Sequence, residues 1–126
     1  MGKIKIGVDY YPERWGEAMW ESDAVRMKEA GVKVIRMAEF AWCKMEPEEG
    51  RFELDWLVKA VNMFGSYGIQ TIICTPTNCA PLWLYEKYPE TLQVQRDGKR
   101  TYPGVRSHRC YNSPIYRLFV ERIIRK

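Results

Sequence analysis

The chain has 126 residues, 46% of them hydrophobic and 13% aromatic, so it is the size of one ordinary domain and has enough apolar side chains for a core. Its 20 Lys and Arg exceed its 16 Asp and Glu by a formal charge of only +4, which favours a solvated basic surface over a nucleic-acid-binding face. No run approaches the roughly 18 apolar residues that cross a membrane. We therefore expect neither nucleic acid nor a membrane as a partner.

Cysteine usage and the first residues predict an intracellular protein. The four cysteines form no Cys-x-x-Cys pair, and a chain with this much core does not need a disulfide framework. The start, MGKIKIGVDYY, has too short an apolar stretch for a secretory signal. We therefore expect reduced thiols and a cytoplasmic location.

Strand and helix patterns alternate in the first part of the chain. Apolar, β-branched runs predict strands at Ile4–Asp9, Val32–Ala38 and Ile69–Thr75. Apolar stripes predict helices over Trp15–Ala30 and from the N-cap Asp55 to Gly68. Gly31 and Gly68 fit the left-handed position that ends a helix. This β-α-β-α-β order predicts an α/β fold with parallel strands and right-handed crossovers.

The second part of the chain predicts loops and short helices. These are a loop at Thr75–Thr77, a short helix at Pro81–Tyr88, an extended piece at Leu92–Gln95 and a turn at Asp97–Gly98. Ser113 and Pro114 supply the N-cap and first turn of a last helix. Its apolar face is expected to hold Ile115, Leu118, Phe119 and Ile123. Because three parallel strands do not close a barrel, we expect the chain to be the front part of something larger.

A carboxylate and two large aromatic side chains, Glu39, Phe40 and Trp42, follow the second predicted strand. In parallel α/β folds, ligands bind at this end of the strands. Carboxylates bind sugar hydroxyls, and the flat C–H faces of sugar rings stack on aromatic rings. Glu39 has two possible roles. It either contacts a sugar directly or pairs with an arginine such as Arg36 or Arg106.

Other polar residues have weaker signals. Asp9 stands at the corresponding end of the first strand and is predicted to be a turn or pairing residue. Arg106 can clamp a substrate hydroxyl or neutralise an acid, and His108, the only histidine, is expected to be a hydrogen-bonded loop residue. Cys110 alone is at most one ligand of a zinc site, which needs about four. There is no phosphate-binding glycine loop, no His-Glu-x-x-His and no Gly-x-Ser-x-Gly motif.

A series of short motifs runs along nearly the whole chain. They are Gly7–Glu13 (GVDYYPE), Met27–Val32 (MKEAGV), Glu39–Trp42 (EFAW), Glu46–Phe52 (EPEEGRF), Thr75–Thr77 (TPT), Pro81–Leu84 (PLWL), Lys87–Glu90 (KYPE) and Cys110–Pro114 (CYNSP). This ordered series resembles the N-terminal portion of a glycoside hydrolase family 42 β-galactosidase. One motif alone is a weak signal, whereas the ordered series is a strong one.

The resemblance implies a TIM (β/α)8 barrel that hydrolyses terminal β-D-galactosyl residues with retention, and residues 1–126 would be its first three β/α units. Two glutamates about 5 Å apart would act as acid/base and nucleophile. In the family these follow strands four and seven, which this chain does not contain. We therefore assign no catalytic residue here and predict that the isolated chain is inactive, although the complete protein would take a β-galactoside as substrate.

The resemblance also implies roles for residues that are present. Arg106 matches the family arginine that contacts the galactosyl unit, and Glu39 and Trp42 would support the same pocket. The family often has glycine where Ala38 stands and a second arginine where Ser107 stands. With a serine at this position, the chain lacks the paired arginines that are frequent in the family.

No cofactor is required by this reading, but some family members bind structural zinc. Cys110 matches the first of their four cysteine ligands, and the other cysteines here, Cys43, Cys74 and Cys79, match none of them.

Two alternatives to an enzyme remain. One is a non-catalytic sugar-binding or assembly module, completed by a partner chain or by self-association into a homo-oligomer across exposed strand edges. The other is a truncated gene product without activity.

Overall fold

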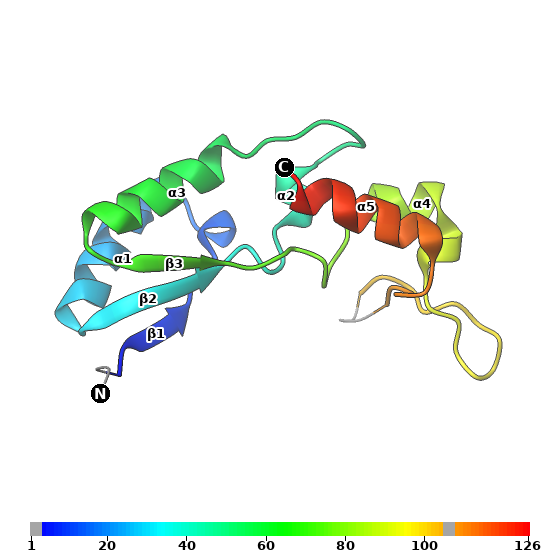
Figure 1. The fold of residues 1–126 in the computed structure, drawn as a ribbon, viewed down its shortest axis with the longest axis horizontal. Helices are drawn as coiled ribbons and strands as arrows, with labels where there is room; N and C mark the ends of the chain where they lie inside the picture. Colours follow the sequence, from blue (N-terminus) through cyan, green and yellow to red (C-terminus); the bar gives the residue numbers. More distant parts are fainter. Residues whose placement is uncertain (1–3, 105–107) are drawn as a thin grey trace. The chain divides into compact units, whose positions relative to one another are not determined.

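A computed structural model of the chain describes residues 4–104 and 108–126 (Figure 1). The chain forms two compact units. Unit 1 consists of Met1–Ala38 and Leu54–Cys74, and unit 2 consists of Glu39–Glu53 and Thr75–Lys126. Within the described ranges, no helix has the length and apolar character needed to cross a membrane.

Unit 1 is a parallel sheet with two crossover helices. Its strands are β1 (Ile6–Asp9), β2 (Val32–Met37) and β3 (Gln70–Ile73), hydrogen-bonded in the order β1-β2-β3. Its helices are α1 (Glu17–Glu29) and α3 (Asp55–Ser66), which lie side by side in Figure 1. The predicted β-α-β-α-β order with parallel strands is therefore confirmed.

Local sequence signals explain where these elements stop. Gly31 and Gly68 both have left-handed backbone angles, with φ of 79° and 77°, directly before β2 and shortly before β3. The first strand is shorter than predicted, because β2 begins at Val32 and offers no partner to Ile4, which is 97% exposed. Asp55 is the first residue of α3 rather than its cap, and the preceding Leu54 makes no side-chain cap bond.

The core of unit 1 lies where the two helices meet the sheet. Its largest buried side chains are Trp20 from α1, Phe64 from α3, and Ile35, Met37 and Ile69 from the sheet side. The ring of Phe64 meets Tyr10 edge-on, with centroids 4.9 Å apart, and the indole N–H of Trp20 donates to a backbone carbonyl before α1. The polar tips of Trp20 and Tyr10 therefore each have an acceptor while their rings fill the core, with the Tyr10 hydroxyl donating to Asp23.

Unit 2 consists of short helices and a hairpin. Its helices are α2 (Trp42–Met45), α4 (Leu82–Lys87), the 3-10 turn η2 (Pro89–Thr91) and α5 (Pro114–Ile124). Antiparallel bridges join Leu92 to Arg109 and Val94 to Arg100, around the predicted turn at Asp97–Gly98. Ser113 accepts a hydrogen bond from the Tyr116 amide, as expected for an N-cap.

The buried face of α5 differs from the prediction. The side chains that face the core are Tyr116, Phe119 and Ile123, whereas Leu118 is 66% exposed. Aromatic partners determine this orientation, because Phe119 packs 5.5 Å from the ring of Trp83 and 5.0 Å from that of Tyr88. The prediction of Leu118 as a core residue was wrong because it left out Tyr116, whose ring is buried while its hydroxyl donates to a backbone carbonyl.

Candidate functional site

The carboxyl end of β1 carries Asp9, which pairs with Arg36 on β2. The parallel register sets these residues opposite each other, and a carboxylate oxygen of Asp9 lies 3.4 Å from Nη1 of Arg36. Both side chains are about half exposed, so the pair contributes little to stability. The prediction that Asp9 is a pairing residue is confirmed.

A hollow of about 440 Å³ lies beside Asp9 in unit 1. Its lining residues are Asp9, Tyr10, Tyr11, Trp15, Met19, Asp23, Arg26 and Met27. The Tyr10 hydroxyl donates to Asp23 over 2.8 Å, and burial together with this acceptor raises the pKa of Tyr10 well above its usual range. Tyr10 therefore stays neutral at physiological pH. Trp15 is half exposed, so its ring is open to a ligand.

The chain leaves β2 through a strained residue. Ala38 is fully buried and has a φ of 74°, a left-handed angle that costs a residue with a Cβ about 1–2 kcal/mol. This is the position at which the resemblance expects glycine, which adopts such angles freely. Glu39 follows in a turn and is half-buried. Its role in binding a substrate stays a prediction.

Trp42, predicted to support a substrate pocket, lies in α2 and is fully buried. Its indole N–H donates to Oε2 of Glu46 over 3.0 Å, and its ring lies 6.2 Å from that of Tyr116. In this structure the ring packs against protein and presents no open face. Whether Trp42 contributes to substrate binding stays a prediction.

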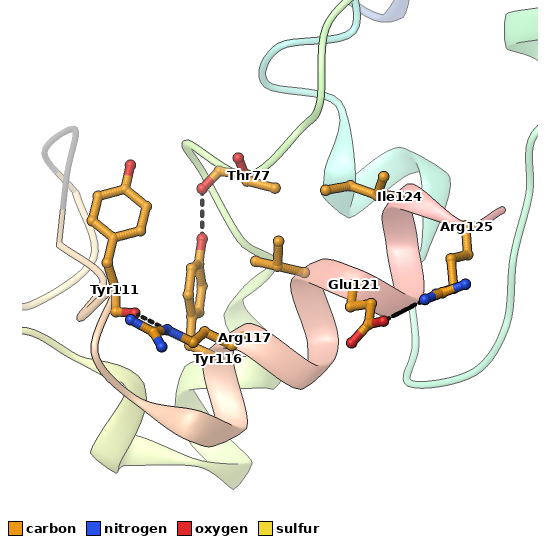
Figure 2. A pocket seen from close by; sticks show the side chains of 8 residues that line it. Thr77, Tyr111, Tyr116, Arg117, Glu121, Ile124 and Arg125 are labelled. Carbon is orange, nitrogen blue, oxygen red and sulfur yellow. Dashed lines mark hydrogen bonds and ion pairs between the residues drawn. The ribbon is translucent and has the colours of Figure 1, made fainter.

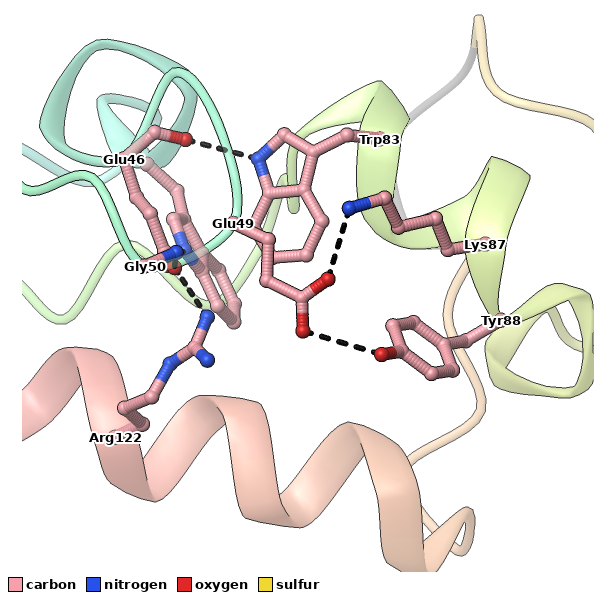
Figure 3. A network of polar contacts seen from close by, with 8 residues as sticks. Glu46, Glu49, Gly50, Trp83, Lys87, Tyr88 and Arg122 are labelled. Carbon is pink, nitrogen blue, oxygen red and sulfur yellow. Dashed lines mark hydrogen bonds and ion pairs between the residues drawn. The ribbon is translucent and has the colours of Figure 1, made fainter.

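Glu46 is the centre of a polar network in unit 2 (Figure 3). The carboxylate is fully buried, and Oε1 accepts hydrogen bonds from the Gly50 amide, over 2.8 Å, and from Arg122. Its own backbone carbonyl accepts from the Trp83 indole over 2.9 Å. With the bond from Trp42, both carboxylate oxygens have donors, which is what a buried carboxylate requires.

A second acid, Glu49, lies next to this centre. It accepts hydrogen bonds from Lys87, over 3.0 Å, and from the Tyr88 hydroxyl, over 3.1 Å, both contributed by the α4 region (Figure 3). The Lys87 ammonium holds the pKa of Glu49 below its usual value, and Glu49 in turn raises the pKa of Lys87. Because their oxygens are occupied by donors, Glu46 and Glu49 hold the fold of unit 2 and are poor candidates for proton transfer.

Sequence patterns did not predict this network. Glu46 and Glu49 belong to the motif Glu46–Phe52, but Glu46 also stands four residues after Trp42, a spacing that brings side chains together on a helix. Arg122 gave no such signal, because it is 76 residues from Glu46 along the chain.

Of the polar residues predicted before the last helix, Arg106 to Cys110, the structure describes only those from His108 onward. Arg106 and Ser107 lie outside the described residues. His108 is buried, and its ring meets that of Tyr85 edge-on at 4.6 Å. Cys110 is a half-buried free thiol, and in the described part of the chain no three His, Cys, Asp or Glu side chains come together to hold a metal. The described residues therefore do not form a zinc site, and a role for Cys110 as one ligand stays a prediction.

Comparison with known proteins gives one consistent result. The family model of glycoside hydrolase family 42, described as beta-galactosidase, matches residues 9–126. The beta-galactosidase BgaA of Clostridium cellulovorans is 52% identical over 121 residues, and BgaH of Haloferax lucentense is 44% identical over 121 residues. Each alignment covers 96% of this chain but 18% of the relative, so the chain spans less than a fifth of the length of these proteins.

Solved structures give the same picture. The polyextremophilic beta-galactosidase from the Antarctic haloarchaeon Halorubrum lacusprofundi superposes with a TM-score of 0.93 at 41% identity. The beta-galactosidase from the psychrophilic Marinomonas ef1 superposes with a TM-score of 0.92 at 34% identity. Both matches cover 96% of this chain and 18% of the other.

Proposed function

Because this chain belongs to glycoside hydrolase family 42, the beta-galactosidase family, we propose that it forms the first three β/α units of a retaining β-galactosidase barrel. The substrate would carry a terminal β-D-galactosyl residue. The observation that carries this proposal is the continuous family match over residues 9–126. The three parallel strands of unit 1, in sequence order, suit the start of such a barrel.

The exposed apolar surface of the sheet supports the same proposal. Ile6 on β1 and Ile72 and Ile73 on β3 are each more than half exposed. Further β/α units would cover such side chains and pair the open edge of β3. The proposed barrel therefore accounts for apolar residues that unit 1 by itself leaves in water.

Substrate binding by this chain would centre on Arg106, with Glu39 and Trp42 in support. An arginine provides a planar set of donors that suits sugar hydroxyls and nearby carboxylates. The two catalytic glutamates would come from strands four and seven, outside residues 1–126. The chain would thus bind and orient the galactosyl unit, while other segments supply the proton transfer and the nucleophile.

A chimera tests this proposal directly. Residues 1–126 would replace the matching segment of BgaA from Clostridium cellulovorans, which is 52% identical. We expect the chimera to hydrolyse a nitrophenyl β-galactoside, and we expect Arg106→Ala to lower kcat/KM by at least about tenfold, as for loss of a charged hydrogen bond. Arg100→Ala, at an exposed arginine, is the matched control. A folded chimera that fails to cleave the galactoside would contradict the proposal.

The isolated chain provides the complementary test. Without the acid/base, catalysis should fall by roughly 10²–10⁴ for that function alone, and without the nucleophile no covalent route exists. We expect purified residues 1–126 to show no turnover of the nitrophenyl β-galactoside above a blank. Turnover well above the blank would show that the chemistry uses residues within this chain.

Zinc belongs to the same proposal for the complete protein. Cys110 would be one of its four ligands. In the chimera, Cys110→Ser is expected to lower the bound zinc measured by metal analysis, whereas Cys43→Ser, at an exposed cysteine, should leave it unchanged. Equal zinc content in both variants would remove Cys110 from the ligand set.

A further inference from the structure

One flank of α1 is covered by α3, its neighbour in unit 1 (Figure 1). Glu17 accepts a hydrogen bond from Lys59, and Glu21 accepts one from the Tyr67 hydroxyl over 2.8 Å. The ammonium of Lys28 lies 6.0 Å from the centre of the same tyrosine ring. Glu17, Glu21 and Lys28 recur at intervals of four and seven residues, so they form one stripe on the helix surface. This stripe shows which side of α1 has a neighbour.

The opposite flank of α1 borders the hollow of about 440 Å³ beside Asp9. The lining of this hollow includes four residues of the helix, which are Met19, Asp23, Arg26 and Met27. At 3.6 residues per turn, their stripe lies roughly 150° around the helix from the stripe that meets α3. The buried Trp20 and Ala24 lie between the two stripes. α1 therefore has a covered flank, a face in the core and a flank along the hollow.

The hollow combines apolar side chains with charged ones. Met19 is 48% exposed, and Trp15, just before α1, is 50% exposed. Asp23 is half-buried and Arg26 is exposed. From Met19 to Met27 the lined stretch covers about 12 Å of the helix axis, at 1.5 Å per residue. Half-exposed apolar side chains along two turns, next to charged ones, are typical of a helix flank that another helix covers.

The position of α1 in the sheet indicates which helix would cover it. Among the described strands, β1 pairs with β2 alone, so its other edge is free. In a (β/α)8 barrel each strand is followed by a helix of the outer ring, so the first helix lies between the second and the eighth. The helix α3 connects β2 to β3 and is therefore the second. The alignments cover only 18% of the relatives, which thus have the chain that an eighth unit needs.

We propose that the hollow along α1 is the docking surface for the helix of the eighth β/α unit, whose strand pairs with the free edge of β1. This inference rests on the proposed barrel and names the residues at which the barrel closes. The occupant is an amphipathic helix that places apolar side chains against Trp15 and Met19 and an acidic side chain within reach of Arg26. The hollow is therefore an assembly surface and not a second substrate site.

Thiol labelling in the chimera of residues 1–126 with BgaA tests this surface. Met19→Cys places a thiol in the hollow, and Ser22→Cys, at an exposed residue of α1 outside the hollow, is the matched control. Each variant is treated with a maleimide, and mass spectrometry of its own peptide separates the new thiol from the natural cysteines. We expect Met19→Cys to be labelled at least about tenfold more slowly in the chimera than in the 126-residue chain, because the docked helix must open first. Ser22→Cys should be labelled at the same rate in both.

Photo-crosslinking identifies the segment that covers the hollow. With a benzophenone amino acid in place of Met19, we expect a crosslink within one polypeptide to the last strand–helix unit of the BgaA barrel. A crosslink between two chains would show that a second copy covers the hollow and would overturn the proposal. A crosslink to any other part of the barrel would overturn it as well.

The labelling result and the enzyme assay fail independently. Equal labelling of the two variants in a chimera that cleaves the galactoside would overturn this inference and leave the proposed function standing. Slow labelling of Met19→Cys in a folded chimera without activity would support the docking surface and count against the proposed function. If the chimera does not fold, the aligned positions of BgaA itself decide, because slow labelling at the first and fast labelling at the second support the surface, and equal labelling overturns it.

Discussion

Replacing Glu46 by glutamine changes one atom of a fully buried side chain, and the donors around it determine the cost. Oε1 accepts from the Gly50 amide and from Arg122, and Oε2 accepts from the Trp42 indole. The amide of glutamine has one oxygen only. If this oxygen serves Gly50 and Arg122, the new NH2 group points at the Trp42 N–H, and two donors face each other.

The expected loss of stability follows from these contacts. A buried indole N–H without an acceptor costs about 1–3 kcal/mol. Arg122 exchanges a charged acceptor for a neutral one, which costs about 1 kcal/mol more, but the 31% exposure of its side chain lets water recover part of this. The free energy of unfolding should therefore fall by roughly 2–4 kcal/mol.

Urea unfolding followed by tryptophan fluorescence measures this change. With a slope of about 2 kcal/mol/M, the midpoint should shift down by roughly 1–2 M while the slope stays constant. Amide hydrogen exchange should show the same loss in α5, which carries Arg122. Glu49→Gln is the matched control, because its side chain is 27% exposed and its partner Lys87 is more exposed still. Its midpoint shift should be clearly smaller.

Two results would refute this reasoning. If Glu46→Gln and Glu49→Gln shift the midpoint equally, burial of the Glu46 carboxylate does not determine its contribution. If Glu46→Gln stabilises the chain, desolvation of the carboxylate must exceed the gain from its three donors, as is known for some buried ion pairs.

Three further changes test the backbone and the buried rings. Gly68→Ala, at a φ of 77°, should lower the free energy of unfolding by about 1 kcal/mol. Gly65→Ala, in the last turn of α3 with open space around it, should raise it by up to about 1 kcal/mol. Urea midpoints of the two variants that move in the same direction would contradict this. Burial raises the pKa of Tyr85 from 10.0 to about 12. Tyr85 therefore ionises in the unfolded chain first, and the free energy of unfolding falls as the pH rises from 10 to 12. Tyr85→Phe should move the midpoint of alkaline unfolding, read by circular dichroism, to higher pH, and an unchanged midpoint would count against this prediction. Ser113→Ala removes the acceptor of the Tyr116 amide and should cost α5 about 1 kcal/mol, seen as faster amide exchange in its first turn but not in α3.

Most of unit 1 was predictable because its signals are local. A glycine in the left-handed conformation ends each crossover helix, and the apolar stripe of α3 places Leu57, Ala60 and Phe64 on one buried face. The strand ends were less predictable, because the length of β1 depends on where β2 begins to pair with it. Strand pairing joins residues far apart in the sequence, and no local pattern contains that information.

Unit 2 was harder to predict for the same physical reason. The predicted apolar face of α5 included Leu118 and left out Tyr116. The sequence pattern does not show that the Tyr116 hydroxyl donates to the carbonyl of Thr77, which lets its ring be buried (Figure 2). Trp42 was chosen as an aromatic at the end of a strand, yet its ring is enclosed by neighbours that include Tyr116. Which face of a ring is open depends on elements that meet only in the folded chain.

Two buried charges of unit 2, Glu46 and Arg109, differ in how well the fold offsets the cost of their burial. Glu46 has three donors, one of which is the cation Arg122, so the fold itself accounts for its presence and its loss should destabilise unit 2. Arg109 is buried too, but within the described residues its side chain contacts tyrosines and forms no ion pair with an acid. The burial of its charge is therefore offset less well than that of Glu46.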